Sequence, residues 1–246
     1  MHNGEVALVT GANKGIGKEI VRRLAAEGMA VYLGARDESR GRAAAAELEG
    51  DVRFVRLDVT DETTVEAAVK RIEHDFGRVD ALVNNAGVAV EWGVEPEQVG
   101  ADELRRAYEV NVFGAVTVTR AVIPLLRAGS RVVMLSSPLG SLTLMTDQTS
   151  SVSAHRLLAY NSSKTALNAL TVLYANVLRP KGILVNAATP GLVGTDLNGL
   201  EPGRDGIRTT EQGASVPVRL ALLTPDGPTG GFFGDDEHAP GGVVPW

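Results

Sequence analysis

An α/β fold with a doubly wound parallel sheet is the architecture that the sequence predicts. Short apolar runs alternate with longer segments of helical periodicity, which is the pattern of repeated βαβ units. A glycine-rich turn directly follows the first apolar run, and no linker rich in Pro, Gly or Ser divides the pattern in two. Because parallel crossovers are right-handed and helices must cover both faces, we expect one Rossmann-type domain, 1–246, with about seven strands and helices on both faces.

The first half is predicted to consist of continuous apolar strands, each followed by an amphipathic helix. A strand that is buried on both faces shows such a run, whereas its covering helix shows apolar residues every three to four positions. The third helix opens with Thr60-Asp61-Glu62, a polar start with an acidic first turn. The predicted order is strand Val6–Thr10, helix Ile16–Glu27, strand Ala30–Ala35, helix Ser39–Leu48, strand Val52–Leu57, the helix after Thr60, and strand Ala81–Val83.

The second half continues the pattern with longer connections. A long helix is expected after Asp102, past Asn111 and toward Leu126, and Pro124 should kink or shorten its end because proline has no backbone N–H to donate. The remaining predicted elements are strand Arg131–Leu135, a polar loop to about Ala154, helix Leu158–Leu178, strand Ile183–Ala187 and strand Gly231–Phe233.

Three long connections are expected to wall a pocket at the carboxyl ends of the strands, where doubly wound sheets bind ligands. They are Val88–Gly100, Pro138–Ala154 and Leu192–Gly213, and the last is the predicted substrate-loop region, 192–213. Their apolar side chains are candidates for the pocket lining, and the alternative is that half of them only anchor their loops. The candidates are Trp92, Leu139, Leu142, Leu144, Met145 and Leu197.

The composition argues against several classes of protein. The 246 residues carry a formal net charge of −6 with scattered Lys and Arg, so no nucleic-acid or membrane-surface partner is expected. With no cysteine and four histidines that lack ligand spacing, no metal site is expected. The first strand begins within a few residues of Met1, and no apolar stretch approaches the roughly 20 residues that cross a bilayer, so we expect a cytoplasmic protein.

The glycine-rich turn Thr10–Gly17 is the first candidate functional feature. Its glycines allow a tight turn and a close approach of the backbone, while the next helix points its N-terminus at the same place, which suits a pyrophosphate. The spacing is GxxxGxG rather than GxGxxG, and an ordinary tight connection between strand and helix stays an alternative for the turn by itself.

Three separated segments resemble the short-chain dehydrogenase/reductase family. Thr10–Gly17 is similar to the TGxxxGIG turn of that family, Asn84-Asn85-Ala86-Gly87 matches its NNAG after the fourth strand, and Asp58 lies where its acidic residue contacts adenine. The resemblance implies a nicotinamide dinucleotide cofactor. The cofactor contacts that it implies here are Gly11, Asn13, Lys14, Gly15, Ile16, Gly17, Asp58, Val59, Asn85, Ala86 and Gly87.

The end of the second strand, Gly34-Ala35-Arg36, favours NADP(H) over NAD(H). A 2′-phosphate carries about −1.5 to −2 charges near neutral pH and needs cations, whereas a ribose diol favours a carboxylate. By resemblance, Ala35 stands where NAD-preferring relatives often carry Asp, and Arg36 and Lys14 match basic positions of NADP-preferring relatives. Two alternatives stay open: the two cations are solvated surface charges, or Asp37 attracts a diol instead of opening the next helix.

Tyr160 and Lys164 are four positions apart, so on a helix their Cβ atoms lie roughly 5–6 Å apart on one face. A nearby ammonium, together with the positive charge of an oxidised nicotinamide, is expected to stabilise the phenolate and to bring the Tyr160 pKa from about 10 toward neutrality. Alone, the pair is also what ordinary packing of a Tyr ring beside a long Lys side chain produces.

Three further segments resemble the family and complete the candidate site. Ser136-Ser137-Pro138-Leu139-Gly140 is similar to its SSxxG, which implies that Ser137 bonds the substrate oxygen and leaves Ser136 as a strand-end residue. Asn111 matches the helix asparagine that holds a proton-relay water, and the segment from Pro190 to Thr195 resembles PGxVxT beside the nicotinamide carboxamide. The resemblance therefore implies catalytic Asn111, Ser137, Tyr160 and Lys164, with cofactor contacts from Tyr160, Lys164, Pro190, Gly191, Val193 and Thr195.

The spacing between Ser137 and Tyr160 departs from the family pattern. The two are 23 positions apart, further than in most relatives, and the extra polar stretch is Ser141–Arg156. The lengthening is similar to that of monomeric carbonyl reductases, whose larger insertion covers the usual helical subunit interface, so a monomer and a homo-oligomer both stay open. His155 is interpreted as a surface imidazole outside the site.

The leading hypothesis is an NADP(H)-dependent carbonyl reductase that transfers a hydride between nicotinamide and a small-molecule aldehyde, ketone or alcohol, with Tyr160 as acid and base. Two alternatives are a noncatalytic NADP(H)-binding sensor or structural module on the same fold, and a partner protein that uses the long loops as an interface. Cofactor binding separates the last alternative from the other two, and hydride turnover separates the enzyme from the sensor.

Overall fold

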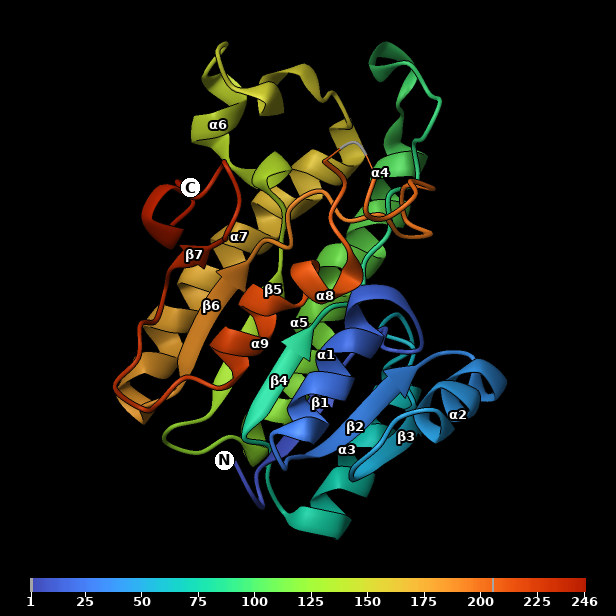
Figure 1. Ribbon diagram of the computed structural model, residues 1–246, viewed down its shortest axis with the longest axis vertical. Helices are drawn as coiled ribbons and strands as arrows, with labels where there is room; N and C mark the ends of the chain where they lie inside the picture. Colours follow the sequence, from blue (N-terminus) through green and yellow to red (C-terminus); the bar gives the residue numbers. More distant parts are fainter. Residues whose placement is uncertain (1, 205) are drawn as a thin grey trace.

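The sheet consists of β1 (Val6–Val9), β2 (Ala30–Ala35), β3 (Val52–Arg56), β4 (Ala81–Asn84), β5 (Arg131–Leu135), β6 (Leu184–Ala188) and β7 (Phe232–Phe233). This computed structural model describes residues 2–204 and 206–246. The strand order is β3-β2-β1-β4-β5-β6-β7, and neighbouring strands are parallel throughout (Figure 1). The chain order reverses between β1 and β4, and such a switch point is where open α/β sheets bind ligands. The predicted fold class is confirmed.

Helices cover both faces of the sheet. One face carries α1 (Gly15–Ala26), α2 (Glu38–Ala46), α8 (Thr210–Gly213) and α9 (Ser215–Ala221), and the other carries α3 (Glu62–Phe76), α4 (Ala101–Tyr108), α5 (Ala115–Val122) and α7 (Leu158–Leu178). Along β1, Val6 and Leu8 belong to the hydrophobic cluster under α3, α5 and α7, whereas Ala7 and Val9 belong to the cluster under α1 and α9. Side chains alternate along a strand, so each face receives its own core.

The helix predicted after Asp102 is present, but it is built from three kinds of turn. The helix α4 passes into a π-helical turn, Glu109–Gly114, then into α5, and ends in a 3-10 turn, Ile123–Leu125. The 3-10 turn contains Pro124, so the prediction that this proline shortens the helix is confirmed. The π-helical turn contains Asn111, and such turns occur frequently at functional sites.

The prediction of a polar loop to about Ala154 is wrong. The segment holds a 3-10 turn at Pro138–Gly140, the helix α6 (Leu142–Thr146) and a second 3-10 turn at Ser151–Ala154. Each begins at a serine whose side chain accepts a hydrogen bond from an amide two or three residues further on. The short helices α8 and α9 were not predicted either. Helices of four to seven residues are too short to show apolar periodicity.

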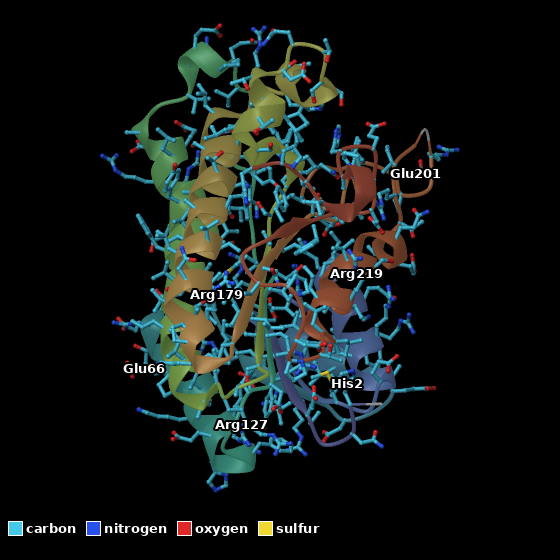
Figure 2. The ribbon with its side chains drawn as sticks, turned by 90° about the vertical axis from the view of Figure 1, so that its left-hand side faces the viewer. His2, Glu66, Arg127, Arg179, Glu201 and Arg219 are labelled. Carbon is cyan, nitrogen blue, oxygen red and sulfur yellow. The ribbon has the colours of Figure 1, made fainter. Side chains whose placement is uncertain are left out.

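The loops that follow the strands gather at one end of the molecule (Figure 1). Figure 2 shows Glu201, in the loop before α8, in the upper half, whereas His2 and Arg127 lie in the lower half, where the strands begin. The outer edge of β7 is covered by the chain itself, because Val244 N donates a hydrogen bond to Phe232 O at 2.9 Å. No helix within the described residues is long and apolar enough to cross a membrane.

Candidate active site

The glycine-rich turn after β1 is shaped by two close approaches. Gly11 has a φ of +62°, and a Cβ at this position would lie 2.9 Å from Cα of Ala86. A Cβ on Gly17 would lie 2.4 Å from Nδ2 of Asn85. Neither position accepts a larger residue without a shift of the backbone. The N-cap residue of α1 makes no side-chain hydrogen bond to the first helical turn, which leaves the first amides of α1 to an anion.

The NNAG segment is bonded directly to this turn. Nδ2 of Asn85 donates to the carbonyl oxygens of Thr10 and Gly11 at 2.8 and 3.1 Å. Oγ1 of Thr10 accepts from the backbone amides of Asn85 and Ala86, both at 3.0 Å. The side-chain amide of Asn85, predicted to contact the cofactor, therefore holds the turn in shape from inside the protein.

The residues predicted for the 2′-phosphate lie at the surface beside the turn. Arg36 follows β2 directly and is exposed. Lys14 forms an ion pair of 2.5 Å with Asp196, in the loop after β6, and this pair lowers the pKa of the Asp196 carboxyl. Asp37 accepts a hydrogen bond from the amide of Arg40 at 2.9 Å, so its interpretation as the residue that opens α2 is confirmed.

Asp58 and Val59 lie in the turn between β3 and α3. Oδ1 of Asp58 accepts from the amide and the hydroxyl of Thr60 at 3.0 and 2.8 Å, which fixes this turn. Val59 is buried, and a Cβ on Gly114 would lie 2.6 Å from its Cγ2. The Val59 side chain therefore packs against the π-helical turn.

Tyr160 and Lys164 lie on one face of α7, as their spacing predicts. Nζ of Lys164 is 5.6 Å from the centroid of the Tyr160 ring. Lys164 is 4% exposed, and its Nζ donates a hydrogen bond to the carbonyl of Leu135 at 2.8 Å. A Cβ on Gly87 would lie 3.4 Å from the same Nζ. The ammonium thus lies between the segment that follows β4 and the end of β5.

Burial sets the protonation of this pair. It raises the pKa of Tyr160 to about 12, against a smaller lowering by the Ser137 hydroxyl, and it lowers the pKa of Lys164 to about 8. In the protein without cofactor, Lys164 alone therefore does not bring the pKa of Tyr160 toward neutrality. The expectation also counted on the positive charge of an oxidised nicotinamide, so for the protein with bound cofactor it stays a prediction. The loss of hydration destabilises the phenolate more than the hydrogen bond from Ser137 stabilises it. At neutral pH the phenol holds its proton and can donate it.

The two serines after β5 have different partners. Ser137 is 9% exposed, its Oγ accepts from the amide of Leu139 at 3.2 Å, and it lies near enough to the Tyr160 phenol to affect its pKa. Oγ of Ser136 donates to Oδ1 of Asn168 on α7 at 2.6 Å. Ser137 therefore faces the candidate proton donor, and Ser136 joins the strand end to the helix.

Asn111 connects three elements. Its Nδ2 donates to the carbonyl of Val88 and to Oγ of Ser163, both at 2.9 Å, and its Oδ1 accepts from the amide of Val88 at 2.8 Å. The side chain is 1% exposed. These contacts tie the π-helical turn to α7 and to the start of the Val88–Gly100 segment.

The loop after β6 lies over the glycine-rich turn. A Cβ on Gly15 would lie 3.7 Å from Cγ2 of Thr195. Val193 is buried and pairs with Arg208 through an isolated β-bridge, which closes the loop onto itself. The turn and the loop therefore lie against each other. The remaining predicted cofactor residues are half-buried in these two segments: Asn13, Gly15, Ile16, Pro190 and Gly191.

The insertion Ser141–Arg156 packs against the C-terminal residues. The amide and Oγ1 of Thr143 donate to the carbonyl of Trp246 at 3.0 and 2.6 Å. Leu144 packs against the small cluster that contains Phe232, so this predicted pocket residue anchors the insertion instead. The predicted pocket residues that stay exposed are Trp92, Leu142 and Leu197.

Three residues of the site were not predicted: Glu91, Ser163 and Asp196. Ser163 accepts from Asn111, Asp196 pairs with Lys14, and Glu91 accepts hydrogen bonds from the first amides of α7. Glu91 and Asp196 reach partners 68 and 182 positions away along the chain, so no local pattern reveals them. His155 is exposed, as interpreted from the sequence.

A doubly wound sheet with a glycine-rich turn beside its switch point is typical of enzymes that bind dinucleotides. The family model described as short chain dehydrogenase matches residues 5–203. The chain belongs to this family of oxidoreductases.

Individual proteins of the family cover almost the whole chain. Carbonyl reductase [NADPH] 1 from Rattus norvegicus is 32% identical over 98% of this chain and 98% of its own length. A short chain dehydrogenase from Burkholderia cenocepacia J2315, solved in complex with NADP, is 27% identical over 95% of this chain and 97% of its own, with a TM-score of 0.80. The 3-ketoacyl-(acyl-carrier-protein) reductase from Brucella melitensis, complexed with NADH, is 27% identical over 96% and 98%, with a TM-score of 0.82.

Proposed function

We propose that the chain is an NADP(H)-dependent reductase of aldehydes or ketones, with Tyr160 as the proton donor. The observation that carries the proposal is the pair of half-buried Tyr160 and buried Lys164 beside Ser137, at the end of β5 and next to the NNAG segment that is bonded to the glycine-rich turn. A protonated phenol, a hydroxyl and an ammonium in one place meet the needs of a carbonyl oxygen that gains negative charge and then a proton.

The chain carries the groups that NADPH requires. The uncapped start of α1 and the closely packed Gly11 and Gly17 suit the pyrophosphate, and Arg36 and Lys14 provide cations for the 2′-phosphate. When bound, NADPH supplies the hydride that reduces the carbonyl carbon. Lys14 exchanges its partner Asp196 for the phosphate, and Thr195 covers the turn from the opposite side.

The side chains of the site supply the proton that the substrate oxygen takes up. Ser137 donates a hydrogen bond to the substrate oxygen and polarises it, and Tyr160 donates its proton to the same oxygen. The phenolate that results lies close to Lys164, whose charge stabilises it until a proton returns from solvent. Asn111 holds α7 and the Val88 segment in place around this pair. General acid catalysis of this kind contributes roughly 10²–10⁴-fold to a rate.

The preference for NADP(H) is proposed from the chain's own charges. The similar structures were solved with NADP in one case and NADH in the other, and the rat relative is named for NADPH. Here Ala35 ends β2 without a carboxylate, and Asp37 uses one of its carboxylate oxygens to cap α2, which makes a ribose diol less favoured at this position than a phosphate. The exposed Arg36 favours a phosphate.

The test follows NADPH and NADH absorbance while the purified protein is offered aldehydes, ketones, diketones and quinones. Wild type is expected to oxidise NADPH faster than NADH, and Tyr160→Phe is expected to keep NADPH binding while losing at least about 100-fold in turnover, because it removes the transferable proton and keeps the ring.

Three outcomes contradict this proposal. Turnover by Tyr160→Phe at the rate of wild type excludes Tyr160 as the proton donor. Binding of NADPH without turnover of any carbonyl in the panel favours the noncatalytic sensor, and absence of NADPH binding excludes both functions.

A further inference from the structure

Glu91 is a buried carboxylate outside the motifs of the family. It lies in the segment between β4 and α4 and is 1% exposed. Its Oε2 accepts a hydrogen bond from the amide of Ala159 at 2.9 Å, and its Oε1 accepts one from the amide of Tyr160 at 3.0 Å. A carboxylate is rarely buried without partners that compensate for the loss of water, and here the partners are two amides of one helix.

These amides are the ones that a helix cannot satisfy by itself. The helix α7 begins at Leu158, so Ala159 and Tyr160 are its second and third residues, whose amides have no partner within the helix. The N-cap residue is Leu157, which offers no side-chain acceptor. In most helices a Ser, Thr, Asp or Asn at the N-cap accepts hydrogen bonds from these amides. Here the N-cap is Leu157, and Glu91 accepts them from a distant segment. Its negative charge also suits the helix N-terminus.

The segment that carries Glu91 is fixed on both sides. Asn111 bonds both the amide and the carbonyl of Val88, three residues earlier, and Nε1 of Trp92 donates to the carbonyl of Leu197 at 2.7 Å. The carboxylate is thus held in place against α7 by contacts on either side of it in the chain.

We propose that Glu91 is a positioning residue, a remote cap of α7 that fixes the backbone of Tyr160 and so aims its phenol at the substrate oxygen. The inference rests on the proposed function, in which Tyr160 is the proton donor. Lys164 lies one turn further along and is held by Leu135, so loss of Glu91 loosens Tyr160 more than Lys164. Displacement of a reacting group by about 1 Å can cost about 100-fold in rate.

The experiment combines removal of the remote cap with a local replacement. Glu91→Ala is expected to lower kcat by about 10- to 100-fold while the Kd for NADPH changes by less than about threefold. Leu157→Asp places a carboxylate at the N-cap, where it can accept from the same amides. The double variant Glu91→Ala/Leu157→Asp is therefore expected to recover kcat to within about threefold of Leu157→Asp alone. Glu97→Ala, which removes an exposed carboxylate from the same segment, is the matched control and is expected to keep the wild-type kcat.

Hydrogen exchange gives a readout that does not need turnover. The amides of Ala159 and Tyr160 are expected to exchange at least about tenfold faster in Glu91→Ala than in wild type, and to regain protection in the double variant. If wild type reduces no carbonyl, the proposed function fails, while this exchange measurement still decides whether Glu91 caps the helix.

The proposal is overturned by a normal kcat in Glu91→Ala, by a loss of kcat that Leu157→Asp does not repair, or by unchanged exchange at the start of α7. If Glu91→Ala does not fold, Glu91→Gln replaces it, because glutamine keeps the size and one acceptor oxygen. A loss of about 3- to 10-fold in kcat is then expected, since one amide faces the new NH₂ group. A normal kcat in Glu91→Gln then overturns the proposal.

Discussion

Burial moves the pKa values of Tyr160 and Lys164 in opposite directions. It disfavours the charged form of each, so the phenol keeps its proton to a pKa of about 12 and the ammonium loses its proton at a pKa of about 8. The sequence places the two residues on one helix face, but it does not show how deeply that face is buried. The protonation state of the site is therefore a property of the fold rather than of the motif.

The buried Lys164 is expected to make the stability of the cofactor-free protein depend on pH. Its pKa is lowered to about 8 in the folded state from 10.5 in the unfolded state, so below pH 8 the folded protein bears the full cost of burying the charge. Between pH 8 and 10.5 the unfolded chain binds the proton more tightly, and the free energy of unfolding rises with pH by up to about 3 kcal/mol.

Denaturant unfolding between pH 7.5 and 10.5 checks this prediction. The free energy of unfolding of wild type relative to Lys164→Met should rise over that range. The exposed Lys181→Met is the control, because its stability relative to wild type should not follow this curve. Parallel pH curves for wild type and Lys164→Met would show that burial of Lys164 carries no such cost.

Arg36 is expected to decide between the two cofactors. Arg36→Ala should weaken NADPH more than NADH by about 1–3 kcal/mol, because only NADPH presents a 2′-phosphate to the guanidinium. Fluorescence titration of both cofactors measures the difference. Arg42→Ala, which breaks a surface pair with Glu38 on α2, is the matched control. Equal weakening of NADPH and NADH by Arg36→Ala would remove Arg36 from the phosphate site.

At the scale of elements, Gly140 determines how closely the turn after β5 approaches α7. A Cβ at this position would lie 2.7 Å from the carbonyl carbon of Lys164 and 2.8 Å from its Cβ. We expect Gly140→Ala to destabilise the protein by about 1–3 kcal/mol and to lower kcat, because the helix backbone beside Tyr160 has to move.

Thermal unfolding and steady-state kinetics measure the two effects of Gly140→Ala. Gly100→Ala is the control, since its Cβ would meet only the end of the Glu103 side chain at 3.5 Å. Similar losses in both variants would mean that the cost lies in the alanine itself and not in the contact with α7.

Strands with a continuous apolar run and helices with many turns were predictable. The bounds of β2, β5 and α7 agree with the sequence-based ranges, since continuous apolar runs and a 21-residue helix leave little freedom in placing them. The helix α6 was missed because five residues held by Ser141 and by contacts with Trp246 show no period. The π-helical turn was missed because its i+5 bonding leaves no mark in the spacing of apolar residues.

The candidate site also contains residues that the sequence indicates and residues that it does not. The spacing predicts that Tyr160 and Lys164 share one helix face, and the family resemblance points to Ser137 and the glycine-rich turn; the fold brings all of them to the same end of the sheet. Glu91 could not be identified from the sequence, because the two amides that donate hydrogen bonds to it belong to another element, α7. A residue that completes a helix end from a distance has no sequence signature.

At the scale of the whole molecule, the strand order assembles the candidate site from distant parts of the chain. The reversal between β1 and β4 separates the glycine-rich turn and Arg36 on one side from Ser137 and α7 on the other. A dinucleotide that spans this reversal contacts both halves of the sheet. Cofactor binding should therefore stabilise the entire fold and not only one loop.

This coupling predicts a thermal shift that discriminates between cofactors. A ligand that binds only the folded state at about 100 times its Kd adds about 2.7 kcal/mol, which for a chain of this size raises Tm by about 5–10 °C. NADPH should produce this shift, and NADH at the same concentration a smaller one. In Arg36→Ala the two shifts should become similar, whereas Tyr160→Phe should keep the NADPH shift because it retains the ring and the helix. Scanning fluorimetry of the three proteins measures all of these shifts. No shift with either cofactor in wild type would show that the candidate site does not hold a dinucleotide, whatever the family to which the chain belongs.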